Sequence, residues 1–148
     1  MTIKKLTPEE YPSALELVWR VFLEFEAPDY TQEGIDEFQR SISDRNYLSM
    51  LTVYGAYIDD VLAGVIATRS LGGHIALFFV DKQFQRQGVG RELFRAVLSD
   101  CRFDSITVNS SPYAVEVYHR LGFKDTDSEQ TVSGLRFTPM KREVKHEE

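Results

Sequence analysis

A glycine-containing loop is the segment of this chain whose residues and spacing most clearly suit a ligand. It follows an apolar run from His74 to Val80, precedes a helical pattern at roughly 88–100, and consists of Gln85, Arg86, Gln87, Gly88, Val89 and Gly90. The first turn of a helix leaves backbone N–H groups without partners and carries partial positive charge, so it can bind an anion. Glycines let a phosphate approach this backbone closely. The pattern indicates a site for a phosphate-bearing ligand.

The loop does not match the common nucleotide-binding patterns. It lacks the third glycine of the dinucleotide fingerprint, and G-x-x-x-x-G-K-[S/T] occurs nowhere in the chain. What remains is Q-x-x-G-x-G. The single cysteine, Cys101, and the histidines His74, His119 and His146 have no zinc-ligand spacing, so we expect no metal.

The elements around the loop predict a mixed sheet with helices on both faces, an α/β (α+β) fold. A cap at Thr7 and a proline at position 8 start a helix that ends before Pro28, and a cap at Thr31 precedes a second helix. The expected order is β-α-α-β-β-β-α-β-α-β-β, with strands near 3–6, 48–58, 61–70, 74–80, 105–109, 123–127 and 131–140 and helices near 8–27, 35–42, 88–100 and 112–121. The segment 74–109 should form a parallel strand-helix-strand crossover.

Composition favours an ordinary globular protein. The 148 residues are 43% hydrophobic and carry a net charge of −6, which disfavours nucleic acid as a partner and favours a cationic or amine ligand. No apolar run approaches the roughly 20 residues of a membrane span, and no signal-peptide core is present, so we expect no membrane partner and a cytoplasmic location. We expect a single domain over 1–148, with a frayed tail at 141–148.

A second block strengthens the interpretation of the loop. The segment VNSSPYAVEVYHRLGF, residues 108–123, places an asparagine at a strand end, then a helix with alanine and tyrosine, then Gly-Phe. Together with Q-x-x-G-x-G it resembles the GCN5-related N-acetyltransferase (GNAT) superfamily, and the likeness covers most of the chain. The resemblance implies the GNAT fold and acetyl-CoA as cosubstrate.

The same resemblance implies where acetyl-CoA binds. The strands ending at Val80 and Asn109 should splay apart around the pantetheine arm, and the segment from Gln85 to Arg91 should hold the pyrophosphate. A backbone N–H near Phe79 or Val80 should polarise the thioester carbonyl. The second block adds Ala114 and Tyr113, and Tyr113 either flanks the acyl-CoA channel or only packs.

Two catalytic side chains follow from the resemblance, each with a structural alternative. Tyr118 matches the tyrosine that protonates the sulfur of the departing coenzyme, but it also lies on the apolar stripe of its helix and could be core. His74 occupies the strand position where many relatives carry a glutamate base. A strand-end histidine bonded to backbone is the commoner case.

The resemblance also implies that the first two helices and their connection, EFEAPDYTQEGIDEF, form the acceptor site together with the final hairpin. Its candidate substrate-binding residues are Phe22, Phe25, Glu26, Asp29 and Tyr30. Opposite charge would draw an amine toward the carboxylates, although most carboxylates on such a segment belong to a solvated face.

The resulting hypothesis is direct, acetyl-CoA-dependent transfer of an acetyl group to the primary amine of a small molecule. Two alternatives remain open: a non-catalytic acyl-CoA-binding regulatory module, and an enzyme that acetylates protein or peptide amino groups. Exposed edge strands and a C-terminal hairpin also make a homodimer plausible.

Overall fold

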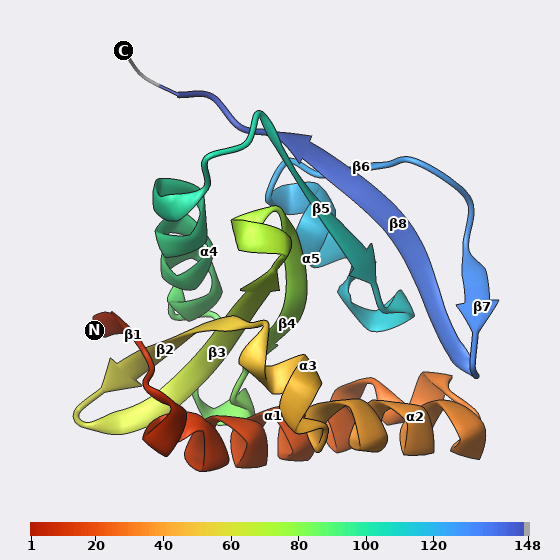
Figure 1. Cartoon of the computed structure of the whole chain (residues 1–148), viewed down its shortest axis with the longest axis horizontal. Coiled ribbons are helices and arrows are strands. Elements are labelled where there is room, and N and C mark those ends of the chain that lie inside the picture. Colours follow the sequence, from red (N-terminus) through yellow and green to blue (C-terminus); the bar gives the residue numbers. More distant parts are fainter. Residues whose placement is uncertain (147–148) are drawn as a thin grey trace.

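The structure is a computed structural model that describes residues 1–146, and its centre is a mixed sheet of the expected class (Figure 1). The sheet has the order β1-β2-β3-β4-β5-β8-β6, and β7 pairs with β8 off this path. The strands are β1 (Thr2–Lys5), β2 (Thr52–Ile58), β3 (Val61–Arg69), β4 (His74–Val80), β5 (Ser105–Ser110), β6 (Lys124–Asp125), β7 (Gln130–Val132) and β8 (Leu135–Glu143). Among the strands of residues 1–146, only β4 and β5 run parallel, as the crossover prediction requires.

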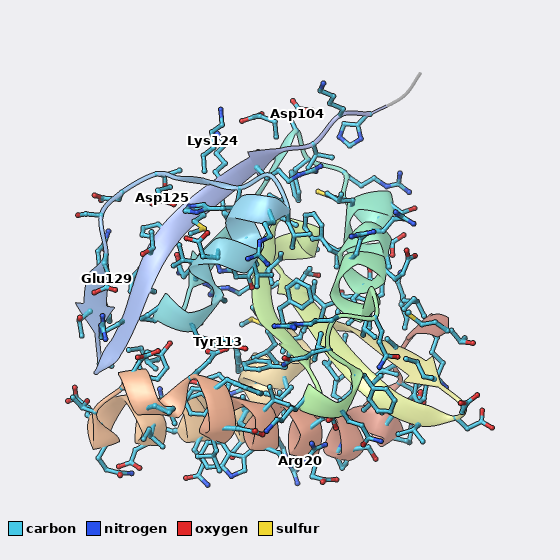
Figure 2. All side chains as sticks on the ribbon, turned by 180° about the vertical axis from the view of Figure 1, so that it is seen from behind. Arg20, Asp104, Tyr113, Lys124, Asp125 and Glu129 are labelled. Atoms are coloured by element: carbon cyan, nitrogen blue, oxygen red, sulfur yellow. The ribbon has the colours of Figure 1, made fainter. Side chains whose placement is uncertain are left out.

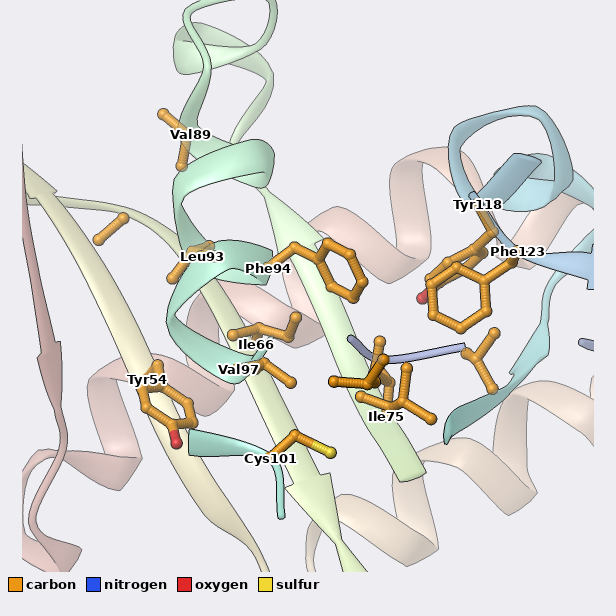
Figure 3. Close-up of a cluster of buried hydrophobic side chains, with 14 of the residues drawn as sticks. Tyr54, Ile66, Ile75, Val89, Leu93, Phe94, Val97, Cys101, Tyr118 and Phe123 are labelled. Atoms are coloured by element: carbon orange, nitrogen blue, oxygen red, sulfur yellow. The ribbon is translucent and has the colours of Figure 1, made fainter. Parts of the chain in front are cut away.

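Helices cover both faces of the sheet because its central strands are apolar on both sides. They are α1 (Tyr11–Phe25), α2 (Gln32–Ile42), α3 (Arg45–Ser49), α4 (Val89–Asp100) and α5 (Val115–Arg120). Neighbouring residues of β3 point to opposite cores: Val65 packs with Phe22 of α1, and Ile66 packs with Leu93 of α4. Figure 3 shows the second core, where Tyr118 lies against Phe123 with ring centroids 5.4 Å apart. No helix within 1–146 is both long and apolar enough to cross a membrane.

The helix starts follow the predicted caps. Thr7 and Glu10 form a capping box before α1, with the Thr7 N–H donating to Glu10 Oε1 at 3.0 Å. At α2 the Thr31 hydroxyl accepts from the Gly34 N–H at 3.4 Å. These bonds satisfy backbone donors that a helix start otherwise leaves unpaired.

Three expected segments are wrong in detail. Residues 45–49 form α3 because the Asp44 carboxylate caps the Asn46 and Tyr47 N–H groups, so the β2 strand begins only at Thr52. The final run is a β7–β8 hairpin, turned at Ser133 and Gly134, which both have positive φ. The segment 141–148, expected to be frayed, is strand as far as Glu143. After the strand, the Val144 N–H donates to the Asp104 carbonyl at 2.8 Å. Residues 147–148 lie outside the described residues.

The parallel pair β4–β5 separates soon after it begins. Pairing is confined to His74 with Thr107 and Ile75 with Val108. A bulge follows on β4, since Thr68 pairs with Ile75 and Ala67 with Leu77, leaving Ala76 as the extra residue. Figure 1 shows the two strands diverging beyond this point while β8 continues beside β5. The facing edges of β4 and β5 are therefore open.

The β7–β8 hairpin is anchored on α2 by a close approach of two glycines. A Cβ added to Gly34 would overlap the carbonyl oxygen of Gly134, and a Cβ on Gly134 would lie 2.4 Å from the Gly34 nitrogen. The Arg136 guanidinium also donates from Nη1 to the Asp29 carbonyl at 3.3 Å. These contacts hold the hairpin over the first turn of α2, where Figure 1 shows its tip.

Gly34→Ala should destabilise the protein by about 1–3 kcal/mol, because the new methyl group displaces the hairpin backbone. In an ordinary helix the same change stabilises the protein by roughly 0.5–1 kcal/mol. A loss of stability would therefore be due to the contact between Gly34 and the hairpin. Urea unfolding measures it, with Gln39→Ala at an exposed position of α2 as control. A Gly34→Ala protein more stable than the parent would show that the hairpin does not pack here.

Candidate active site

The glycine-containing loop leaves β4 and enters α4 as the sequence predicted, with exposed backbone donors. Gly88 is the N-cap of α4 and has φ +82°, a conformation that side-chain-bearing residues rarely adopt. The first bond of the helix runs from the Glu92 N–H to the Gly88 carbonyl at 3.0 Å. Within residues 1–146, the N–H groups of Arg86 to Arg91, which precede Glu92 in the chain, donate to no backbone carbonyl. This turn has the geometry of an anion site.

Polar contacts to the end of β4 and to α1 hold the loop in place. The Gln85 side-chain amide donates to the Val80 carbonyl at 3.2 Å. The Asp81 carboxylate accepts from the Gln83 N–H at 2.9 Å and from the guanidinium of Arg20 at 2.8 Å. Figure 2 shows Arg20 on α1. Arg20 thereby neutralises an anion that would oppose a phosphate ligand.

A cavity of about 300 Å³ occupies the space where β4 and β5 diverge. Its walls come from the α1–α2 connection, α2, α3, both strands, α5 and the β7–β8 hairpin. Residues that line it include Glu26, Tyr30, Phe38, Tyr47, Ala76, Phe78, Phe79, Asn109, Ser111, Ala114, Tyr118, Leu135 and Phe137. Mostly apolar walls with a few polar groups are typical of small-molecule sites.

Tyr118 of α5 is buried at the wall of this cavity. Its ring meets Phe78 of β4 edge-on, with centroids 6.0 Å apart, and the side chain is 6% exposed. Burial raises the pKa of the Tyr118 phenol above its ordinary value, and the charge of Glu26 adds to the rise. Within residues 1–146 its hydroxyl bonds to no protein group. The phenol is thus a neutral donor beside the open edge of β4.

Within residues 1–146, Glu26 is one of two carboxylates that line the cavity, and the other, Glu37, is paired with Arg40. Glu26 is the C-cap of α1, and its N–H donates to the Phe22 carbonyl at 2.9 Å. Burial raises the pKa of the Glu26 carboxyl to about 8; the Ser111 hydroxyl opposes the rise, and the charge of Asp29 adds to it. A carboxyl group in this state exchanges protons near neutral pH.

His74 does not reach the cavity wall. It stands at the closed end of the junction, where its Nδ1 lies 2.8 Å from the Thr107 hydroxyl, which donates to the Gly73 carbonyl at 3.3 Å. Burial lowers the pKa of the His74 imidazole to about 4, and the charge of Arg69 contributes. These contacts favour the structural alternative for His74.

The other expected residues divide between the cavity and its support. Tyr30, Phe79, Asn109 and Ala114 line the cavity with Glu26, whereas Val80 does not. Phe22 is fully buried beneath it, with its ring 3.9 Å from that of Phe38. Phe25 stacks on exposed Tyr113, which Figure 2 labels, with ring centroids 5.2 Å apart. Asp29 contributes its carbonyl to Arg136.

Sequence reasoning missed the wall supplied by α3, and it predicted a final hairpin as a wall without locating its turn. The predicted strand 48–58 overlaps the end of α3, although Asp44 is a good N-cap residue and would have indicated a helix there. Ser133-Gly134 between two β-rich runs is a hairpin signal that would have split the last strand. Both segments contribute lining residues far in sequence from the loop.

The open strand junction, the anion-binding turn and the buried phenol together define a site of the acyltransferase class. Comparison with known families agrees: the family described as "Acetyltransferase (GNAT) domain" matches residues 26–144. The chain therefore belongs to the GNAT acetyltransferase family, as the resemblance implied. Members of this fold bind acetyl-CoA.

Solved structures share the fold at low sequence identity. A GCN5-related N-acetyltransferase from Rhodopseudomonas palustris is similar with a TM-score of 0.83 and 21% identity, covering 97% of this chain and 95% of that one. The PaiA N-acetyltransferase from Thermoplasma acidophilum, solved in complex with coenzyme A, has a TM-score of 0.73 and 16% identity, covering 97% and 99%.

A curated relative is also similar in sequence. It is a subunit of the glutamine-hydrolyzing GMP synthase from Methanopyrus kandleri, and it is 24% identical over 124 residues, which are 84% of this chain. The chain spans 38% of the length of that relative.

The burial of His74 predicts an acid-dependent loss of stability. The unfolded chain takes up a proton near pH 6.5 and the folded one only near pH 4, so His74 reduces stability as pH falls through this window and has no such effect above it. Between pH 7.5 and 4.5, the free energy of unfolding of His74→Gln should fall by about 1–2 kcal/mol less than that of the parent, after allowance for solvent screening. Urea unfolding from pH 7.5 to 4.5 measures it, with exposed His119→Gln as control. Parallel curves for the parent and His74→Gln would contradict the assignment.

Proposed function

We propose that this protein transfers the acetyl group of acetyl-CoA directly to the primary amine of a small molecule. The observation that carries the proposal is the cavity between the diverging strands, because it places Tyr118 and Glu26 beside the open edge of β4. Acyl transfer to an amine needs a channel for the thioester, a donor for the leaving sulfur and a polar group near the amine.

The open edges suit the linear arm of the cosubstrate. Beyond the bulge at Ala76, β4 offers backbone donors and acceptors toward β5, and Asn109 lies on the opposite edge. An amide-bearing arm can bond to such edges as an added strand does. The segment from Gln85 to Arg91 would then hold the pyrophosphate through its N–H groups.

The chemistry assigned to the chain's own groups is simple. The neutral amine attacks the thioester carbon, and a β4 backbone N–H near Phe79 stabilises the negative charge on the carbonyl oxygen. Tyr118 donates its proton to the sulfur as the carbon–sulfur bond breaks. The raised pKa of Tyr118 keeps the phenol protonated until the thiolate forms, and the thiolate is a stronger base than the thioester sulfur.

The size and closure of the cavity favour a small acceptor over a protein segment. About 300 Å³ is at the lower limit for ligand sites, and α2 and the β7–β8 hairpin close the side away from the loop. The aromatic side chains Tyr30, Phe38 and Phe137 suit an acceptor that carries an apolar group beside its amine.

Calorimetric titration with acetyl-CoA tests the cosubstrate site, and we expect saturable one-to-one binding. Gly88→Ala should weaken it at least about tenfold, because a methyl group at a left-handed position strains the turn and blocks the approach of a phosphate. Gly72→Ala is the matched control, since Gly72 also has positive φ with open space around its Cβ position but lies outside the site. Equal weakening by both substitutions would indicate strain alone, and no binding by the parent would refute the proposed function.

Tyr118→Phe should lower kcat about 10–100-fold and leave the Kd for acetyl-CoA unchanged, because it removes only the donor to sulfur. Thiol release against a panel of primary amines measures turnover, and Tyr57→Phe on β2 is the control. Unchanged kcat in Tyr118→Phe would assign Tyr118 to the core. Binding without thiol release for every amine would favour a regulatory module instead, and release with peptides alone would favour a protein substrate.

A further inference from the structure

Glu26 is an acidic side chain of the cavity that no positive charge balances. Its position at the end of α1 places it near the last carbonyl groups of that helix, whose partial negative charge disfavours a carboxylate. In the part of the chain that the structure describes, no Lys, Arg or His forms an ion pair with it. The side chain is instead set among aromatic residues and the Ser111 hydroxyl.

The charged groups around the cavity are already engaged with other partners. Arg136 donates to Glu129 and to the Asp29 carbonyl, and Glu37 is paired with Arg40. The titratable groups that face Glu26 from the packed elements are Asp29, Tyr30, Glu37, Tyr47, Tyr118 and Arg136. None of them offers Glu26 a counter-charge, so a cation entering the cavity would find Glu26 as its uncompensated partner.

We propose that Glu26 is the general base that takes a proton from the acceptor ammonium group, an inference that rests on the proposed function. The geometry separates the two proton-transfer groups: Tyr118 projects from α5 beside β4, while Glu26 enters from the end of α1 on the acceptor side. His74, bonded to Thr107 at the closed end of the junction, is outside this arrangement.

The protons balance in this assignment. A proton moves from the ammonium nitrogen to a Glu26 carboxylate oxygen, and the freed lone pair forms the carbon–nitrogen bond as the carbon–sulfur bond breaks. Tyr118 gives its proton to sulfur and regains one from the new amide nitrogen. Glu26 releases the first proton to solvent, so each turnover yields the amide, the thiol and one proton.

The environment of Glu26 suits this task. An ordinary carboxylate is a weak base toward an alkylammonium ion, and proton transfer becomes easier as the two pKa values approach. Burial raises the pKa of Glu26 to about 8, which narrows that gap. The free enzyme should therefore gain activity as pH rises toward 8, because Glu26 must be ionised to accept the proton.

Glu26→Gln is the decisive variant, because it keeps the shape of the side chain and removes the base. With 2-phenylethylamine as acceptor we expect kcat/KM to fall at least about 100-fold and its rise with pH to flatten. The loss should be smaller with 2,2-difluoro-2-phenylethylamine, whose fluorines make the ammonium group more acidic, so that more of the amine arrives neutral. Glu24→Gln, an exposed neighbour paired with Lys82 at 3.2 Å, is the matched control.

A second measurement needs no acceptor. Between pH 4.5 and about 8 the folded protein keeps a proton on Glu26 that the unfolded chain releases, so the parent should lose stability relative to Glu26→Gln as pH rises. The ratio of their unfolding constants should change by up to about tenfold per pH unit in this window. Glu24→Gln should show no such trend.

The outcomes separate the inference from the proposed function. An active parent whose pH profile survives in Glu26→Gln would overturn the base assignment and leave the acetyltransferase proposal standing. Loss of the acidic limb in His74→Gln, with Glu26→Gln unaffected, would return that role to His74. A parent inactive with every amine would refute the proposed function itself, and with it the role of Glu26.

Discussion

The divergence of β4 from β5 is the constraint on which the site depends. Unpaired backbone groups inside a protein are costly, so two neighbouring strands separate only where other contacts hold them apart. β4 pairs with β3 on both sides of the bulge, and β5 pairs with β8 over its entire length, which fixes each strand independently. The bulge at Ala76 then turns β4 away, and Tyr118 packs against Phe78 at the junction. The facing edges of β4 and β5 can stay open because each strand is held by its other neighbour, β3 or β8.

The rest of the fold uses this opening from both faces. On one face α4 begins at the end of the loop, so the helix that buries Leu93 against the sheet also presents its first N–H groups beside the junction. On the other face α1 ends at the cavity, and its buried residue Phe22 supports Phe38 in the wall. Core packing and ligand geometry are therefore set by the same helices, and a change in either core would move the site.

Local sequence signals predicted the elements that carry the cosubstrate loop. The apolar pattern of β4, the glycines after it and the caps at Thr7 and Thr31 each depend on neighbours within a few residues, and the structure agrees with them. The cavity could not be predicted in this way. Its walls join residue 26 to residue 137, and whether Glu26 is solvated or buried depends on packing between α1, α5 and the hairpin. A single acidic residue in an acidic segment carries no local mark of that environment.

The same desolvation acts on two groups with opposite tasks. It favours the protonated form of Tyr118, which suits an acid, and it raises the pKa of Glu26 to about 8, which makes that carboxylate a stronger base when it ionises. Closing the cavity further would strengthen both effects, because water that solvates the charged forms would be excluded. A ligand that fills the open edges would do this directly. The strand separation that creates the binding site thus also sets the proton affinities of the groups beside it.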